Sequence, residues 1–530
     1  MIKSHNDDVL YEHSLDHHLE FFSKAGSLFS AGKKGGRTAY APYGGISATT
    51  TALTLFQQMW IINNAQARLD AMKLLFWMRN PRGGAGNRSG FRECLRWLAS
   101  EDAIDGVDWL RANLDRVRDY GRFDDLKVLF GTVIEKDAAE LWKAYIEAGD
   151  HYALKWAKRD MIPLQRAFNT NEAGLRKILR AKGRTSVEQH MCANLSKCAS
   201  CGKVTHWSRM KNEAGERLDD VYVCENCGTH RTGTVIWPTI DYSHVPSKCM
   251  SVSAKTFMLH DPSGFSAYKA ALNSGDAKVN ASVLFPHDCL RTALQGQHDI
   301  ANGQFEALPN YMEETGERIM AIADTSGSMG CTASGSVSCM DVSVSLGMYC
   351  SDRLGKDNPF YRRYMEFSSE PYFIDWRKRT FSQQASIRTG EIASTNIERT
   401  LDYLLECATT MSVAPDQMIT TLLILSDMQF DRATSERFYD VGCKGTEATV
   451  VEKCMSRWEA AGYKRPRIVY WNLEGYAGQP AKVTTPNTAL VSGFSPSILK
   501  AVLSGEDFTP LAIMRRTIDA YNVSTPAGAE

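Results

Sequence analysis

The stretch "RIMAIADTSGSMG", residues 318–330, decides the fold of the second half of the chain. Its apolar run ends in Asp324, and hydroxyl side chains follow at Ser326 and Ser328. A short run of apolar residues without polar alternation is typical of a strand that is buried on both faces of a parallel sheet. A second run of this kind, "ITTLLILSD", ends in Asp427. The second half of the chain therefore contains two predicted buried strands that each end at an aspartate.

Strand and helix patterns alternate around these two runs. This alternation predicts a parallel, doubly wound, Rossmann-like sheet within residues 311–530, and such sheets bind ligands at the carboxyl ends of their strands. The further strand candidates are "RRYMEFSS", "PYFIDW", "RIVYWNL" and "TALVSGF", and the helix candidates are "CMDVSVSLGMYCSDRLG", "TNIERTLDYLLECATT", "VVEKCMSRWEAAG" and "SILKAVLSG".

The two aspartates are expected at the same edge of this sheet, because each stands where a buried strand stops. Thr395 precedes a helix and belongs to a loop that could reach the same edge. Carboxylate and hydroxyl oxygens together suit Mg²⁺ or Mn²⁺. The alternative is a polar strand-to-helix turn in which Ser and Asp only cap the backbone. The candidate metal ligands are Asp324, Ser326, Ser328, Thr395 and Asp427.

The order D-x-S-x-S, then a threonine, then an aspartate after an apolar strand resembles the metal-ion-dependent adhesion site of von Willebrand factor A domains. The resemblance implies that these five residues hold Mg²⁺ and leave one coordination position open for a partner. An acidic residue of that partner would fill the open position.

Residues 1–190 read mainly as helices separated by short turns, and helical texture returns in residues 237–310. The segment "TALTLFQQMWIINNAQARLDAMKLLFWMRN" places apolar residues at helical spacing, and "PRGGAGN" then breaks the pattern. Helices joined by short turns predict a HEAT-like α-solenoid of paired helices. Residues 191–236, which lack this pattern, are expected to form an insertion into it.

The insertion carries four cysteines with the spacing C-x₂-C-x₂₂-C-x₂-C. Four thiolates at this spacing can close a tetrahedral Zn²⁺ site, and the residues between the two pairs are expected to form the hairpin of a zinc ribbon. The alternatives are two coincidental CxxC pairs or a redox pair. Cys192 and His206 are the spare zinc ligands if one of the four cysteines is not a ligand. The predicted zinc is structural, and its ligands are Cys198, Cys201, Cys224 and Cys227.

Two basic runs polarise the helical part, although Lys+Arg equals Asp+Glu at 61 each over the whole chain. Residues 155–184 hold nine Lys or Arg against two acidic residues, and residues 73–96 hold six against one. A solenoid lined with these cations would bind a phosphate backbone, whereas each run alone also fits an ordinary solvated helix face. The predicted RNA contacts are Arg79, Arg82, Lys155, Lys158, Arg159, Arg176, Lys177 and Arg180.

The whole chain resembles the TROVE/Ro autoantigen architecture, and especially its bacterial and phage relatives. The matching stretches include "MRNPRGGAGNR", "YGRFDDL", "KVNASVLFPHD", "LLILSDMQFD" and "LVSGFSPS". The resemblance implies a ring of helical repeats that is joined by the A domain and binds noncoding RNA or single-stranded RNA ends. The cysteine-rich insertion is not part of that pattern.

The sequence favours a protein that binds RNA and does not catalyse a reaction. Two other functions are alternatives to this prediction. The first is a protein-interaction adaptor that uses the metal site, for example as a partner of a MoxR-type AAA+ ATPase. The chain itself has no P-loop motif and is not expected to be an ATPase. The second is a metal-dependent nuclease, against which we find no second acidic cluster near the site.

The bulk composition sets the remaining bounds. A chain of 530 residues predicts two to four domains. Its net charge of zero excludes a uniformly basic nucleic-acid binder. Fourteen cysteines without a visible signal segment predict reduced thiols and metal ligands in a cytoplasmic protein, and no apolar run is long enough to span a bilayer.

Overall fold

The structure of the protein is a computed structural model. It describes residues 2–3, 9–10, 17–25, 51–62, 64–182, 198, 200–202, 207–211, 217–224, 226–232, 240–245, 247–281, 284–313, 316–330, 332–334, 337–367, 371–387, 397–426, 450–473, 487–494, 498–499 and 508–527.

The centre of the second half is a six-stranded sheet within these residues, with the strand order β10-β9-β6-β11-β12-β13. Neighbouring strands are parallel except for β10, which pairs antiparallel with β9 at one edge. β6 is apolar and buried throughout, and β11 is buried and apolar between Thr421 and Ser426, as the sequence predicts for strands covered on both faces. Their bounds are β6 Ile319–Ala323, β9 Arg363–Glu366, β10 Tyr372–Asp375, β11 Thr421–Ser426, β12 Arg467–Asn472 and β13 Thr488–Ser492.

The chain order of these strands reverses between β6 and β11. From β6 the chain proceeds to β9 and β10 on one side, whereas β11 is followed by β12 and β13 on the other. The carboxyl ends of β6 and β11 therefore meet at a topological switch point, where open α/β sheets bind their ligands. The helices of this part are α15 Cys339–Asp352, α16 Phe381–Ala385, α17 Ile397–Thr410, α18 Val450–Ala460 and α20 Pro510–Asp519.

A short hairpin stands between the switch point and α15. Its strands are β7 Thr332–Ser334 and β8 Val337–Ser338, and they pair antiparallel. Ser338 then caps α15, because its hydroxyl accepts from the backbone N–H of Asp341.

The first half is helical, and successive helices pack on one another. The predicted apolar stripe of residues 51–80 is divided into two helices, because Asn64 caps a new helix and Ile62 is exposed in the turn. A solenoid of paired helices stays a prediction. The helices are α2 Ala52–Trp60, α3 Ala65–Arg79, α4 Arg88–Leu98, α5 Gly106–Tyr120, η1 Phe123–Leu129, α6 Glu135–Glu147, α7 His151–Trp156, α8 Ile162–Ala167 and α9 Glu172–Ala181.

Strands interrupt the helices where the insertion is expected. β3 Trp207–Lys211, β4 Arg217–Cys224 and β5 His230–Thr232 form an antiparallel sheet in that order, so the predicted hairpin is present. Helices then resume and enclose a small apolar core of their own. They are η3 Tyr242–His244, α11 Ser247–His260, α12 Pro262–Ser274, α13 Pro286–Leu294 and α14 His298–Glu306.

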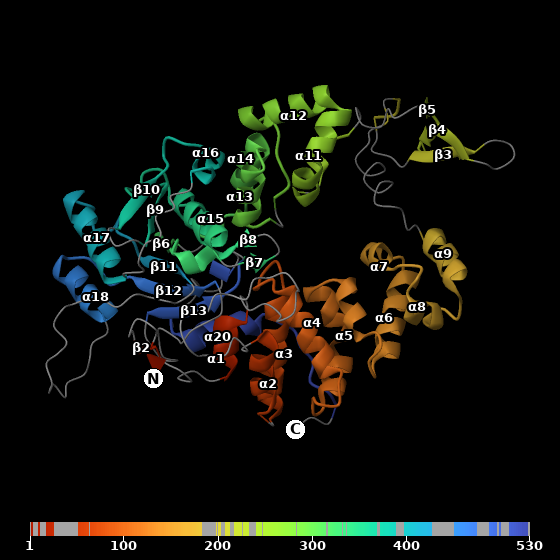
Figure 1. Ribbon diagram of the computed structural model, residues 1–530, viewed down its shortest axis with the longest axis horizontal. Coiled ribbons are helices and arrows are strands. Elements are labelled where there is room, and N and C mark those ends of the chain that lie inside the picture. The colour runs from red at the N-terminus through yellow and green to blue at the C-terminus, as the bar shows by residue number, and fades with distance from the viewer. Residues whose placement is uncertain are drawn as a thin grey trace.

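The two helical stretches extend from the sheet as two arms, with α2–α9 in one and α11–α14 in the other (Figure 1). One continuous apolar core joins the first arm to the sheet. Helix α1, His17–Lys24, packs on β13, and the Ser492 hydroxyl donates to the Phe22 carbonyl at 2.9 Å. No described helix is both long enough and apolar enough to cross a membrane.

Candidate nucleic-acid interface and metal centres

The four predicted zinc ligands lie together. The sulfur atoms of Cys198, Cys201, Cys224 and Cys227 are all within 4.8 Å of one another. The Sγ–Sγ distances are 3.6 Å for Cys198–Cys227 and 4.0 Å for Cys201–Cys224. A tetrahedral zinc with Zn–S bonds of about 2.3 Å requires sulfurs about 3.8 Å apart. The four side chains therefore fit a Zn²⁺ ion.

Two backbone turns of the same design place these sulfurs. Each CxxC pair is followed by a glycine with positive φ, 67° at Gly202 and 70° at Gly228. Each glycine N–H donates at 2.8 Å to the carbonyl of the first cysteine of its pair. A backbone N–H from Cys201 to the Cys198 sulfur also lowers the pKa of that thiol, which favours the thiolate that a metal requires. The spare ligands Cys192 and His206 lie outside the described residues.

The carboxyl edge of β6 holds one buried carboxylate of the predicted Mg²⁺ site. Asp324 is completely buried, and its Oδ1 accepts from the backbone N–H of Ser326 at 2.9 Å. Its Oδ2 accepts from the hydroxyl of Ser426, the last residue of β11, at 2.6 Å. The ends of β6 and β11 therefore meet at Asp324, as expected for a switch point.

The structure places only part of the predicted Mg²⁺ ligand set. Asp324 and Ser326 are described, and Asp427 follows Ser426 directly in the sequence. Thr395, Asp427 and the side chain of Ser328 lie outside the described residues. Full coordination by the five residues stays a prediction.

A further buried carboxylate, Glu366, was missed by the sequence reasoning. It ends β9, and its backbone pairs with Ala323, the last residue of β6. Its two oxygens accept from the hydroxyls of Tyr364 at 3.3 Å and Tyr372 at 3.4 Å. Burial, followed by the Glu366 charge, raises the pKa of the Tyr364 hydroxyl well above its usual range. A lone acidic residue at a strand end is the only signal that the sequence offered.

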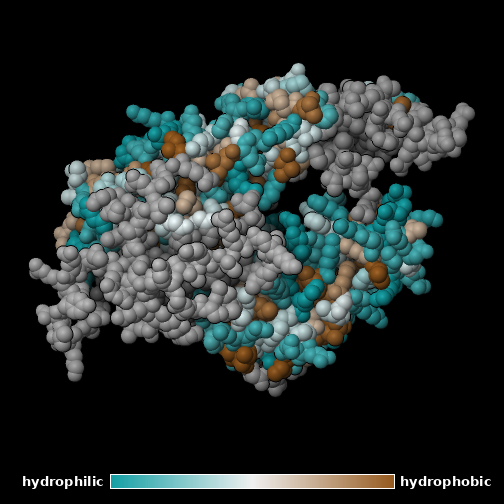
Figure 2. Space-filling model, viewed as in Figure 1, coloured by the Kyte–Doolittle hydropathy of each residue, from teal (hydrophilic) through white to brown (hydrophobic). Residues whose placement is uncertain are grey.

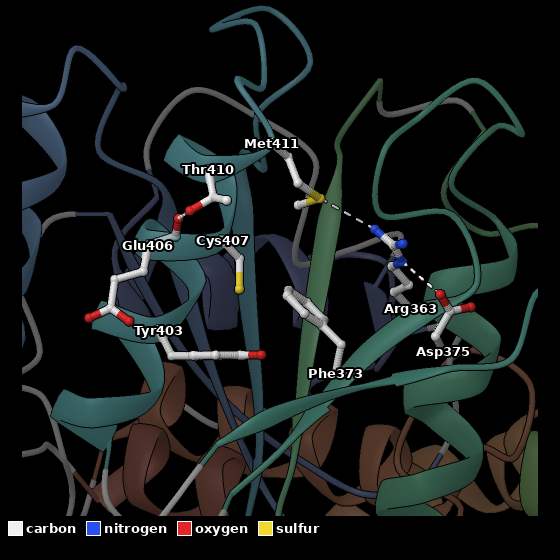
Figure 3. A pocket seen from close by; sticks show the side chains of 8 residues that line it. All are labelled: Arg363, Phe373, Asp375, Tyr403, Glu406, Cys407, Thr410 and Met411. Atoms are coloured by element: carbon white, nitrogen blue, oxygen red, sulfur yellow. Dashed lines mark hydrogen bonds and ion pairs between the residues drawn. The ribbon is translucent and has the colours of Figure 1, made fainter.

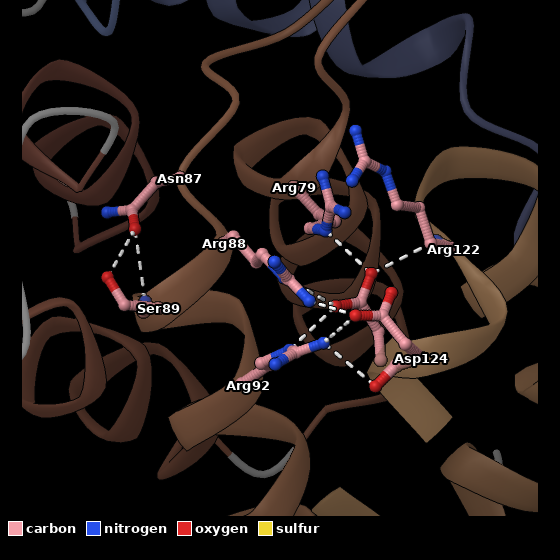
Figure 4. Close-up of polar contacts among 9 residues, drawn as sticks. Arg79, Asn87, Arg88, Ser89, Arg92, Arg122 and Asp124 are labelled. Carbon is pink, nitrogen blue, oxygen red and sulfur yellow. Dashed lines mark hydrogen bonds and ion pairs between the residues drawn. The ribbon is translucent and has the colours of Figure 1, made fainter. Parts of the chain in front are cut away.

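A buried ion-pair network corrects one predicted RNA contact, Arg79. This side chain is only 3% exposed, and its Nε donates to Asp125 at 2.8 Å. Burial lowers the pKa of the Arg79 guanidinium against the attraction of Asp125. Arg88 and Arg92 reach the same carboxylate and its neighbour Asp124 (Figure 4). The ion pair between Arg79 and Asp125 therefore links α3 to η1, and the buried Arg79 side chain cannot contact RNA.

The other predicted RNA contacts lie at the surface of the first arm. Two of them share an acidic partner: Arg159 contacts Glu172 at 3.0 Å, and Arg176 contacts it at 3.5 Å. Figure 2 shows hydrophilic residues over much of this arm, with hydrophobic residues among them, and a hollow between the two arms. Arg82, Lys155, Lys158, Lys177 and Arg180 are exposed.

The Arg and Lys side chains outnumber the acids around η1. Lys127 lies close to Lys158, Arg92 and Arg88, with Asp124 as the attractive charge. Burial is the main cause that lowers the pKa of Lys127, and these three cations lower it further. Asp124 already accepts from Arg88 and Arg92, so it cannot neutralise the whole group.

An open pocket of about 380 Å³ lies elsewhere, between the β9–β10 edge and α17 (Figure 3). Phe373 and Tyr403 form its apolar wall, and the pair Arg363–Asp375, with N–O 3.1 Å, lies at one side. Arg363 begins β9, so this pocket is at the opposite end of the strands from Asp324. It is separate from the candidate metal site.

Two family models match the chain, and neither covers half of it. Residues 318–520 match a domain of unknown function, DUF7788, and residues 226–324 match another, DUF2828. The curated protein "Uncharacterized protein L728" of Acanthamoeba polyphaga mimivirus is 26% identical over 276 residues. That match covers 50% of this chain and 45% of the viral protein, so the chain spans less than half of the length of this relative.

A solved structure also aligns with the chain, the crystal structure of the Deinococcus radiodurans RO (RSR) protein. The alignment covers 89% of this chain and 87% of that chain, with 11% identity and a TM-score of 0.32. At this identity and TM-score, the likeness is too weak to transfer a fold or a function.

Proposed function

We propose that the protein binds RNA of the noncoding or single-stranded type on the cationic surface of its first helical arm, without catalysing a reaction. The observation that carries the proposal is the excess of cations around η1 and α7, which the buried Asp124 and Asp125 do not balance. Phosphate groups are the natural counter-charge for such a surface. The sequence motifs that resemble the Ro architecture support the same function.

The experiment is a filter-binding titration of the full chain with a fluorescent single-stranded RNA at several salt concentrations. We expect log K to fall linearly with log salt, because bound phosphates release counterions. The variant K155E/K158E/R159E should lower RNA affinity at least tenfold, since it reverses three exposed charges on α7 and in the residues that follow it. The matched control is Lys464→Glu, an exposed lysine in the α/β part. Equal affinity of the triple variant and the wild type would overturn this assignment.

The metal sites have separate proposed roles. Four thiolates hold a structural Zn²⁺ in the insertion, in the manner of a zinc ribbon. Asp324, Ser326, Ser328, Thr395 and Asp427 hold Mg²⁺ at the switch point and leave a position for an acidic residue of a protein partner. The buried Asp324, hydrogen-bonded between two strand ends, supports this adaptor role alongside RNA binding.

Substitution of Asp324 separates the adaptor from the RNA binder. Asp324→Asn keeps the side-chain volume and removes the charge, so we expect Mn²⁺ binding, followed by electron paramagnetic resonance, to be lost. RNA affinity should remain unchanged, because the cationic surface is on the other part of the chain. Asp416→Asn, at an exposed position, is the control. RNA cleavage by the wild type with Mn²⁺ would instead support the nuclease alternative.

A further inference from the structure

Trp156 lies at the centre of three cations on the first helical arm. It is the last residue of α7, it is half-buried, and part of its ring packs against the main core. The Nζ atoms of Lys155 and Lys127 lie 5.7 Å and 5.9 Å from its ring centroid, and the Arg122 guanidinium carbon lies 5.8 Å from it. Most of the cation–aromatic pairs of the described residues join one ring to a single cation, so this triple arrangement stands out.

The contacts of this group come from two adjoining elements. Lys127 belongs to η1, and Arg122 is the residue directly before it. Lys155 and Trp156 are the last two residues of α7, which packs on η1. Arg122 and Lys155 are exposed to solvent. Lys158 lies close to Lys127 and extends the same positive surface. The ring thus packs partly against the core and has three cations within 6 Å of its centroid.

The nearby carboxylates are already engaged. Asp125 accepts from Arg79 at 2.8 Å and from Arg92 at 2.7 Å, and Asp124 accepts from Arg88 and Arg92. These acids therefore offset the cations around Trp156 only in part, since Asp124 attracts Lys127 but also accepts from Arg88 and Arg92. An anionic ligand would be attracted to the cations around Trp156. A flat group that lies between two anionic groups of that ligand could then stack on the Trp156 ring.

We propose that Trp156 stacks against an unpaired RNA base while Arg122, Lys127 and Lys155 hold the flanking phosphates. This inference rests on the proposed RNA-binding function and names one contact that carries it. In a single-stranded nucleic acid, anionic phosphates alternate with flat, uncharged bases. This pattern matches an aromatic ring with three cations close to it. A base-paired duplex buries its base faces and cannot present them to the ring.

The experiment measures the affinity of the full chain for three fluorescent 12-mers by anisotropy: oligo(A), oligo(dA) and an abasic ribose-phosphate strand. The variant Trp156→Ala should lower affinity for oligo(A) about tenfold. It should leave affinity for the abasic strand unchanged, because only the stacking contact is removed. Trp156→Phe retains an aromatic face and should retain most of the affinity. A weaker oligo(dA) complex would identify RNA as the preferred source of the base.

The cations are tested by the salt dependence. Lys127→Gln should reduce the slope of log K against log salt by about 0.7, as expected for one lost phosphate contact on a single strand. Trp156→Ala should leave the slope unchanged. The matched aromatic control is Phe168→Ala, since Phe168 is half-buried beneath one lysine, Lys143, at 5.7 Å.

The outcomes separate this inference from the function on which it rests. If the wild type binds none of the three strands, RNA binding itself is wrong. If the wild type binds RNA and Trp156→Ala binds it equally well, only the stacking site is wrong. Equal losses from Trp156→Ala and Phe168→Ala would indicate general loosening of the arm and would also overturn the stacking site.

Discussion

His287 is a histidine that the fold keeps in its neutral form. It lies in the first turn of α13, and its ring centroid is 5.2 Å from that of Phe285 and 6.3 Å from that of Phe494. Burial, the largest cause, lowers its pKa from 6.5 to about 4, with Asp288 opposing and Lys248 adding to the shift. The positive end of the α13 dipole also disfavours an imidazolium at this position.

This burial predicts a loss of stability in acid. Between pH 6.5 and 4 the unfolded chain binds a proton at His287 that the folded chain does not, so the free energy of unfolding falls as the pH is lowered through this window. The loss is complete near pH 4 and amounts to about 3 kcal/mol. His287→Leu should remove this component, seen as the difference between urea-unfolding curves of variant and wild type across pH. Parallel pH profiles of the two proteins would contradict the prediction.

At the residue scale, the sequence separates exposed from buried cations poorly. Arg79 and Arg82 lie three residues apart in one basic run, yet only Arg82 reaches solvent, because Asp125 on a distant segment captures Arg79. Trp156 offers no periodic signal of its own, and its cations come from two elements. The four zinc-site cysteines were predictable because their spacing alone limits where the sulfurs can lie.

At the scale of elements, the two CxxC turns bring four cysteines together, and a metal ion bound by these cysteines would stabilise the insertion. Within its described residues, the insertion contributes a three-stranded sheet, and the apolar cluster there consists of Cys198, Cys201 and Cys224. So small a core does not fold alone, and structural zinc normally supplies the missing free energy.

Removal of one thiolate should therefore release the metal and loosen the insertion. We expect about one zinc per chain in the wild type by elemental analysis, and less than a tenth of this in Cys224→Ser. Proteolysis within residues 198–232 should accelerate, whereas the sheet of the α/β part stays protected. Cys249→Ser, which changes a cysteine outside the cluster, is the control and should keep its zinc. A full zinc content in Cys224→Ser would refute the site.

Element identity followed from periodicity for the buried strands, because β6 and β11 are too short and too apolar to form surface helices. Two features did not follow. The antiparallel direction of β10 depends on its pairing with β9, which no local pattern encodes. Helix α20 has a clear start signal, Thr509 followed by Pro510, and the sequence reasoning passed over it.

At the scale of the whole molecule, the C-terminal segment fastens the first helices to the α/β part. The Tyr521 ring packs 4.8 Å from that of Tyr120, and its hydroxyl accepts from the Asn80 side chain at 3.1 Å. Arg515 pairs with the buried Asp70, and Asn113 bonds the backbone of Ser524. Tyr521 belongs to the same continuous apolar core as the sheet, and Tyr120 packs against that core.

Because helices α2–α5 and the sheet share one apolar core, we expect them to unfold in a single cooperative transition. Tyr521→Ala removes a ring buried at this junction and should lower the free energy of unfolding by about 3–5 kcal/mol. Calorimetry should show one transition for helices α2–α5 and the sheet, moved as a whole to lower temperature. Tyr152→Ala, at a side chain that is 58% exposed, should change stability by less than about 0.5 kcal/mol. Two transitions, only one of which moves, would show separate cores.

The packing of α1 against β13, described above, has a consequence for the ribosome. Phe22 and Trp77 leave the exit tunnel hundreds of residues before β13, whose Ser492 meets the Phe22 carbonyl. At a synthesis rate of about 5–20 residues per second, the apolar side of α1 waits for tens of seconds without its final neighbour. The contact between α1 and β13 therefore cannot form until residues 488–492 have left the ribosome, whereas the contacts of α1 with α2 and α3 can form much earlier in synthesis.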